Sequence, residues 1–251
     1  MKQLLIRGDD LGYSEAVTLG MISAYEKGLV NSMALMVNMP YASEAVLLAK
    51  KHKGLCLGLH VNVTNGKALA PKELIPTLID DNGVFISSRI RRQQIADGVP
   101  LFNTDEAYIE AKYQLDKYIE MVGEMPEYID FHVLEVPELI DAVVRVYKEY
   151  EIKYCLYAED IPAIVHEQCM KQYDYYQDHN NNFENMFIDA DFQMQDGLNV
   201  VVTHPGFIDY DLLTTSSMIN ERLYDYSLVT SPILKKWLKD NHIEVISFRD
   251  L

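Results

Sequence analysis

Short apolar segments alternate with helical segments along the first third of the chain, and this alternation constrains the fold more than any other feature. Residues 4–6, 32–37 and 55–63 have the length and apolar content of buried strands. The segments that begin at Ser14 and Ser43 have helical spacing of apolar residues. Strands that alternate with helices pair in parallel and carry the helices outside the sheet. We therefore predict an α/β fold built on a parallel sheet.

The alternation is interrupted once and then resumes. Residues 67–104 contain several prolines and an Asp-Asn-Gly turn signal, which predict an irregular insertion with a helix near residues 88–96. Residues 170–196 are rich in Tyr, Asp and Asn and are expected to form a polar loop. No repeat or linker divides the sequence, so we expect a single domain over residues 1–251. The remaining predicted elements are helices near 105–122, 138–150 and 232–240 and strands near 128–133, 154–157, 198–203 and 243–248.

The charge of the chain narrows the range of its partners. Its 251 residues carry a formal net charge of -16, which disfavours a nucleic acid or an anionic membrane and suits a neutral or cationic small substrate.

Arg7, Asp9 and Asp10 interrupt the first apolar run, so it does not resemble a secretory signal. The three cysteines are odd in number and form no Cys-x-x-Cys pair, which is typical of reduced thiols. We expect a cytoplasmic protein.

Polar side chains with useful chemistry lie in or just after several predicted strands. Asp9 and Asp10 follow the first strand, His60 and His132 lie in two later ones, and His204 follows another. An Asp-Asp pair alone is more typical of a turn with a helix cap, and one strand histidine is more typical of a core. In parallel α/β folds, however, the carboxyl ends of the strands form the active site. Five such residues at equivalent ends therefore favour a site.

One carboxylate and two imidazoles form a ligand set for Zn, Mn, Fe, Co or Ni that leaves positions for water. Asp10, His60 and His132 can supply this set. Asp9 is then a nearby carboxylate that can accept a proton, and His204 can act from the other side as a general acid. The sequence thus predicts different roles for the two neighbouring aspartates.

These motifs resemble those of the YdjC family of carbohydrate deacetylases, which includes chitooligosaccharide deacetylase. Each motif alone is weak, but together they occur in order over most of the chain. The segments that carry the resemblance are DDLGYS (9–14), GLVNS (28–32), MVNMP (36–40), GLHVNVTNG (58–66), DFH (130–132), THPG (203–206) and SFRDL (247–251).

The resemblance implies an irregular (β/α) barrel of the glycoside hydrolase/deacetylase type. It also implies metal-dependent removal of acetyl groups from N-acetylated sugars or small oligosaccharides. By motif position, Asp10, His60 and His132 become the metal ligands, Asp9 the base and His204 the acid. The family implies Mg²⁺ and a homodimer, whereas the donor set suits Zn²⁺ or another transition metal better, so the ion stays open.

The segment DFHVLEV (130–136) departs from the histidine-rich stretch of the family. Its first histidine, His132, is kept, while Phe131, Leu134 and Val136 replace polar residues. The ligand is therefore retained in a more apolar pocket, which leaves the identity of the sugar open.

Tyr13, Asn62 and Arg222 are candidate substrate contacts. A packed tyrosine, a turn amide and a surface ion pair are their alternative interpretations. Two other functions also compete with deacetylation. A non-catalytic metal- or sugar-binding protein would not require Asp9 and His204, and a phosphate-ester hydrolase is disfavoured by the negative charge and by the lack of a glycine-rich phosphate loop.

Overall fold

The computed structural model describes residues 1–155, the backbone of 164–169, residue 194 and residues 196–251. The polar loop predicted over residues 170–196 lies almost entirely outside this part of the chain. Within the described residues, no helix has both the length and the apolar character needed to cross a bilayer.

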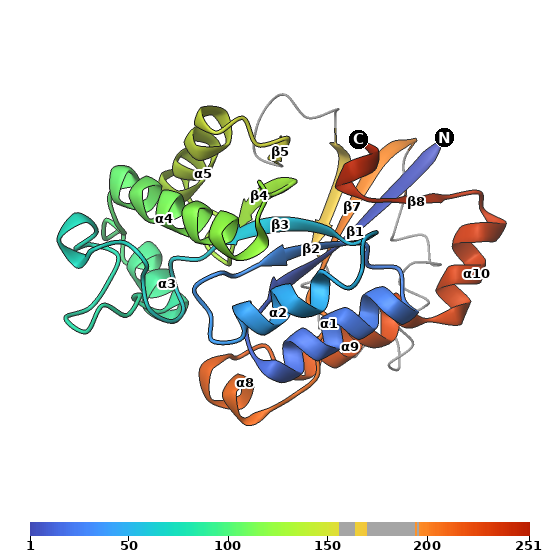
Figure 1. The fold of residues 1–251 in the computed structure, drawn as a ribbon, viewed down its shortest axis with the longest axis horizontal. Helices are drawn as coiled ribbons and strands as arrows, with labels where there is room; N and C mark the ends of the chain where they lie inside the picture. Colours follow the sequence, from blue (N-terminus) through green and yellow to red (C-terminus); the bar gives the residue numbers. More distant parts are fainter. Residues whose placement is uncertain (156–163, 170–193, 195) are drawn as a thin grey trace.

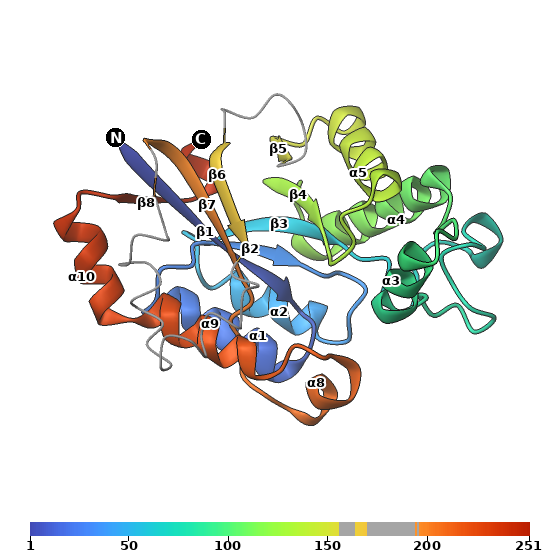
Figure 2. The ribbon, with the colours of Figure 1, turned by 180° about the vertical axis from the view of Figure 1, so that it is seen from behind.

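The fold is built on one curled sheet whose described pairings are all parallel (Figures 1 and 2). Its order is β5-β4-β3-β2-β1-β7-β6, and β8 pairs with the first part of β1 while β2 pairs with the second. The predicted α/β fold with a parallel sheet is thereby confirmed. The strands are β1 (Lys2–Leu11), β2 (Ser32–Leu35), β3 (Cys56–Val61), β4 (Tyr128–Phe131), β5 (Tyr154–Cys155), β6 (Ile164–Cys169), β7 (Gly197–Thr203) and β8 (Glu244–Ile246).

Helices cover the outer face of the sheet, with α1 against β1, α4 against β3 and α5 against β4 (Figure 1). Most lie where the sequence predicts them, but α8, α9 and β6 were not predicted. The helices of the described residues are α1 (Glu15–Lys27), α2 (Ala42–Ala49), α3 (Ser88–Ala96), α4 (Thr104–Val122), α5 (Pro137–Glu149), α8 (Tyr210–Thr215), α9 (Asn220–Thr230) and α10 (Pro232–Asp240).

Helix α1 begins shortly after the aspartate pair and is fixed by a cap at its start and by a close contact near its middle. The Ser14 hydroxyl accepts a hydrogen bond from the backbone N–H of Val17, which caps the first turn. At Gly20, an added Cβ would lie 2.5 Å from the backbone nitrogen of Phe207. Only glycine allows this approach, so α1 packs directly against the chain that follows β7 and holds it beside the end of β1.

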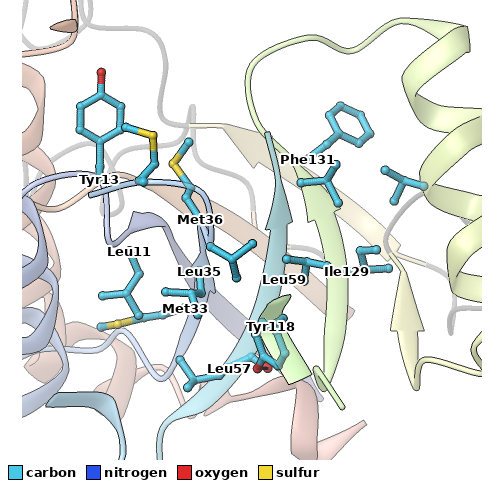
Figure 3. Close-up of a cluster of buried hydrophobic side chains, with 14 of the residues drawn as sticks. Leu11, Tyr13, Met33, Leu35, Met36, Leu57, Leu59, Tyr118, Ile129 and Phe131 are labelled. Carbon is cyan, nitrogen blue, oxygen red and sulfur yellow. Dashed lines mark hydrogen bonds between the residues drawn. The ribbon is translucent and has the colours of Figure 1, made fainter. Parts of the chain in front are cut away.

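The outer face of the sheet is apolar across strands β1 to β4. Backbone register aligns Leu11, Leu35, Leu59 and Ile129 across four adjacent strands, and Figure 3 shows these side chains in the buried cluster. Strand side chains alternate between faces, so the neighbouring residues on β3 and β4 point to the inside of the curl. This row therefore fixes which residues enter the interior.

The inner face changes from apolar to polar along the strands. Near the amino ends, a second cluster includes Leu5, Cys56, Tyr128 and Phe248, with the last two rings stacked 4.0 Å apart. An added Cβ at Gly58 would lie 2.4 Å from the Tyr128 ring, so glycine at this position makes room for that ring. This apolar floor closes the amino-terminal end and leaves the carboxyl ends for polar residues.

The insertion at 67–104 contains α3, a 3-10 turn at Lys72–Leu74 and isolated antiparallel bridges. Buried polar side chains attach it to α4 and link its own segments to one another. Glu110 of α4 accepts from the backbone N–H groups of Leu69 and Ala70 and from Gln114 Nε2. Arg91 of α3 donates to the carbonyl oxygens of residues 77 and 101. These contacts, which we call the insertion anchor, hold α3 at the rim of the site.

Candidate metal and catalytic site

The two adjacent aspartates lie at the carboxyl end of β1, where the strand contains a bulge. Between residues 8 and 11, three steps along β1 match two steps along β2. Asp10 has a φ of 77°, in the left-handed region that aspartate tolerates better than most residues. Consequently Asp9 and Asp10 both line one pocket, although successive strand residues normally face opposite sides.

His60 and His132 converge on the same oxygen of Asp10. His60 Nε2 lies 3.4 Å and His132 Nδ1 2.9 Å from Asp10 Oδ1. The other ring nitrogens have their own partners, because His60 Nδ1 is 2.7 Å from Asp130 Oδ1 and His132 Nε2 is 3.0 Å from the side-chain amide of Asn65. The carboxylate of Asp130 holds the proton on Nδ1 of His60 and leaves Nε2 free to bind. If the Asn65 amide oxygen accepts a hydrogen bond from a protonated Nε2 of His132, Nδ1 of His132 carries no proton and is likewise free to bind.

The side chains present fit a divalent cation. Asp10 Oδ1 is buried without a hydrogen-bond partner of good geometry, and Asp10, His60 and His132 offer ligand atoms within 4.8 Å of one another. Burial alone would lower the pKa of His60, but the carboxylates of Asp130 and Asp9 outweigh it and raise this pKa to about 10. The same negative field favours a metal ion, which would displace the proton from His60. One carboxylate and two imidazoles suit a transition metal.

Each aspartate has a buried arginine of its own. Arg7 binds both oxygens of Asp9, at 2.8 Å from Nε and 3.0 Å from Nη2, and its Nη1 lies 3.0 Å from Asp130 Oδ2. Arg222 Nη2 donates to Asp10 Oδ2 at 2.7 Å. Burial would raise the pKa of Asp10, but His132 and Arg222 hold it well below its usual value. Asp10 is therefore ionised, as a carboxylate that binds a metal ion must be.

His204 follows β7 and is held by α9. Its backbone N–H donates to Asp225 Oδ2 at 2.7 Å, and the same oxygen lies 3.9 Å from His204 Nδ1. Burial lowers the pKa of His204 to about 4, with Arg222 acting in the same direction and Asp10 against it. The imidazole is therefore neutral at pH 7 and can accept a proton before it donates one.

These residues form the base of a pocket of about 530 Å³, within the size range of small-molecule sites. The insertion contributes Ser88 and Arg92 from α3 to one wall. The end of β4 and the segment after it contribute Phe131 and Val133. Residues 215–218, from the end of α8 toward α9, form another part. The pocket thus combines a charged base with mixed polar and apolar walls.

The predicted substrate contacts differ in their placement. Tyr13 and Arg222 line the pocket, and the Tyr13 hydroxyl donates to the backbone oxygen of Thr215 at 3.0 Å. Arg222 is buried by the Asp10 pair and keeps Nη1 without a hydrogen-bond partner. Asn62 is fully buried, and its side chain bonds the turn that follows β3, through Asn65 among others. Within the described residues, the pocket lining does not include Asn62.

Sequence reasoning missed the supporting roles of Arg7, Asp130 and Asp225. The first two have a signal in the period-two pattern of strands, because Arg7 lies two residues before Asp9 and Asp130 two before His132. Both therefore share the inner face with the predicted site residues. Asp225 lies three residues after Arg222 on α9 and has no signal without that helix.

Comparisons with known proteins find one matching family model and relatives that are similar over nearly the whole chain. The family described as YdjC-like protein matches residues 3–240. A relative named carbohydrate deacetylase 2, from Listeria innocua, is 28% identical over 254 residues, which covers 99% of this chain and 98% of the relative. A carbohydrate deacetylase from Geobacillus stearothermophilus is 29% identical, with 98% and 96% covered.

Solved structures share the fold. A protein from Enterococcus faecalis described as a candidate for cellobiose-phosphate cleavage has a TM-score of 0.79 and 24% identity, covering 99% of this chain and 98% of its own. A family 4 carbohydrate esterase from Streptomyces lividans, solved in complex with acetate, has a TM-score of 0.52 and 13% identity, covering 99% and 94%. At these identities the likeness concerns the fold alone.

Proposed function

This chain belongs to the YdjC family, and we propose that it is a metal-dependent hydrolase that removes acetyl groups from N-acetylated sugars or small oligosaccharides. Its relatives from Listeria and Geobacillus bear the name carbohydrate deacetylase, which supports this class of reaction. The observation that carries the proposal is the convergence of His60 and His132 on Asp10 Oδ1, with Asp9 beside it in the same pocket.

Asp10, His60 and His132 would hold the metal ion, and the donor set favours Zn²⁺ or another transition metal over Mg²⁺. A bound ion would polarise the acetyl carbonyl and make a nearby water more acidic.

The other side chains manage the protons of amide hydrolysis. Asp9 accepts the proton of the attacking water as the water oxygen bonds to the acetyl carbon. His204, neutral at pH 7, takes up that proton and delivers it to the sugar nitrogen as the carbon–nitrogen bond breaks. Asp225 holds His204 in place through the backbone contact at 2.7 Å. The products are acetate and the free amino sugar.

Arg222 is the substrate contact that the geometry supports best. Its Nη2 is committed to Asp10, while Nη1 is buried at the pocket wall without a partner. A buried, unpaired donor is costly unless a ligand satisfies it. We assign to it a substrate oxygen, which it would bind more strongly as negative charge develops there. Tyr13 provides a ring surface beside it, 5.5 Å from the guanidinium carbon to the ring centre.

The test is acetate release from a panel of N-acetylated mono- and disaccharides. The protein is first treated with a chelator and then given Mg²⁺, Zn²⁺, Mn²⁺ or Co²⁺ one at a time. Asp9→Asn removes the proposed base, and Asp141→Asn, at an exposed position of α5, is the matched control. We expect metal-dependent release that falls by about 10²–10⁴-fold in Asp9→Asn and is unchanged in Asp141→Asn.

Calorimetric titration of the same metals distinguishes the alternatives. Metal binding without acetate release from any substrate would favour the binding protein considered above. Release that is independent of added metal and of Asp9 would contradict the mechanism. The cytoplasmic location and the homodimer expected from the sequence remain predictions, and sedimentation analysis of the purified chain tests the second.

A further inference from the structure

We propose that Arg7 is a positioning residue that fixes the proposed base Asp9 by holding Asp9 and Asp130 with one guanidinium group. This inference rests on the proposed deacetylase function. Arg7 enters the inner face of the curl from β1, two residues before Asp9, and its side chain is 4% exposed.

Arg7 uses each of its three nitrogens for a carboxylate. Nε and Nη2 donate to the two oxygens of Asp9 at 2.8 and 3.0 Å, a bidentate arrangement. Nη1 lies 3.0 Å from Asp130 Oδ2, and the side chain of Asp130 is fully buried. A planar fork matches a carboxylate at two points and restricts its rotation, whereas a lysine ammonium is a point charge that cannot.

Asp130 extends this contact to the metal ligands. Its second oxygen, Oδ1, lies 2.7 Å from Nδ1 of His60, whose Nε2 faces Asp10. Asp9, Arg7, Asp130 and His60 therefore form one connected chain from the base to a proposed ligand. Tyr128, two residues before Asp130 on β4, is fully buried and packs against Gly58 in the apolar floor.

The charges lead to the same assignment. Asp9, His60 and Asp130 form a second group whose ligand atoms lie within 4.8 Å of one another. Both of its carboxylates lie against the Arg7 guanidinium, while Asp10 Oδ1 in the other group faces the ring nitrogens of His60 and His132. Arg7 thus takes the place of a cation between Asp9 and Asp130 and leaves the Asp10 group for the metal ion. Asp9 remains a base because it is not drawn into metal coordination.

The decisive variant is Arg7→Lys, which keeps the charge and removes the fork. We expect kcat for acetate release to fall about 10²-fold, because small misplacements of a reacting group have effects of this size. KM and the calorimetric Kd for Zn²⁺ or Co²⁺ should stay within about threefold, since the metal ligands are retained. Arg249→Lys is the matched control, because Arg249 also binds a carboxylate with two contacts, to Glu127, but at the surface.

A kcat of Arg7→Lys within about threefold of the wild type would overturn the proposal, because charge alone would then suffice. A large loss of Zn²⁺ affinity in Arg7→Lys would also overturn the proposal, because Arg7 would then position the metal ligands instead of the base.

If circular dichroism shows that Arg7→Lys does not fold, the double variant Arg7→Gln/Asp130→Asn is used in its place and is compared with Asp130→Asn alone. We expect the double variant to be much slower than the single one, and equal rates would refute the role. A wild type that binds metal but releases no acetate would instead refute the proposed function, and the role of Arg7 with it.

Discussion

At the strand ends, Arg7 and Arg222 pair with carboxylates, whereas in the insertion anchor Arg91 and Glu110 bind backbone peptide groups. In the anchor, each charge satisfies N–H or C=O groups of irregular chain that have no other buried partner, so the charge stabilises the loops. At the strand ends, the charged side chains pair with one another, and Arg222 Nη1 keeps no hydrogen-bond partner. The site differs from the anchor because its charged side chains line a pocket, whereas Arg91 and Glu110 are absent from that pocket's lining.

The largest effect should come from changing a proposed metal ligand of the strand-end site. His132→Ala removes one of the nitrogens that face Asp10 and leaves the rest of the fold in place. We expect acetate release to fall by roughly 10³-fold, with metal affinity lowered by at least about 10²-fold, since supporting residues alone account for 10–100-fold. Titration calorimetry and the acetate assay measure both. His52→Ala should leave them unchanged, and unaltered metal affinity in His132→Ala would disprove the ligand role.

The matching change in the insertion anchor should affect stability instead of chemistry. Arg91→Met removes the donor to the carbonyl oxygens of Thr77 and Leu101, and the contact with Leu101 is buried. The free energy of unfolding should fall by about 2–4 kcal/mol, while metal affinity of the folded protein is unchanged. Urea unfolding provides the measurement, with Arg89→Met, at an exposed position of α3, as control. If Arg91→Met lowered metal affinity as much as His132→Ala does, the anchor and the strand-end site would not differ in function.

Tyr13→Phe tests a residue at the boundary between packing and binding. Its hydroxyl already donates to Thr215, so we expect a loss of about 1 kcal/mol in stability. KM should change by less than about threefold, because the ring that faces Arg222 is retained. The control is Tyr210→Phe, at the exposed start of α8, which should leave KM unchanged. If Tyr13→Phe instead raises KM tenfold or more, the Tyr13 hydroxyl itself contacts the substrate.

The smallest effect is a pH dependence of the anchor. Burial raises the pKa of Glu110, and hydrogen bonds from Gln114, Ala70 and Leu69 offset part of this increase. The folded state therefore binds the proton more tightly than the unfolded state, so stability is lost as pH rises from the usual Glu value through the folded pKa. Glu110→Gln should show a flatter stability profile over that window in urea unfolding at several pH values. In the control Glu120→Gln, at an exposed position of the same helix, the free energy of unfolding should depend on pH as it does in the wild type.

The sequence predicted the fold and the positions of the reactive side chains better than the contacts that hold them. Helices with clear periodicity, such as α5 and α10, lie close to their predicted bounds. Asp9, Asp10, His60, His132 and His204 share one pocket because parallel strands bring their carboxyl ends together.

What the sequence did not indicate depends on tertiary contacts. Arg222 and Asp225 occupy the buried face of helix α9 and weaken its amphipathic pattern. Arg222 pairs with Asp10, and Asp225 accepts from the backbone N–H of His204. The membership of the YdjC family, predicted from the order of the motifs, is confirmed by the match over residues 3–240.

The bulge at Asp10 has a consequence for how this site tolerates change in chain length. It adds one residue to a period-two pattern, so that Leu11 returns to the outer face after two successive inward side chains. Deletion of either aspartate would restore regular alternation and would remove a carboxylate from the pocket without moving Leu11 out of the core. An inserted residue would instead turn Leu11 toward the histidines. Asp9 and Asp10 are therefore neighbours by geometric necessity, and exchange of one for a longer acidic side chain would not reproduce two carboxylates at these positions.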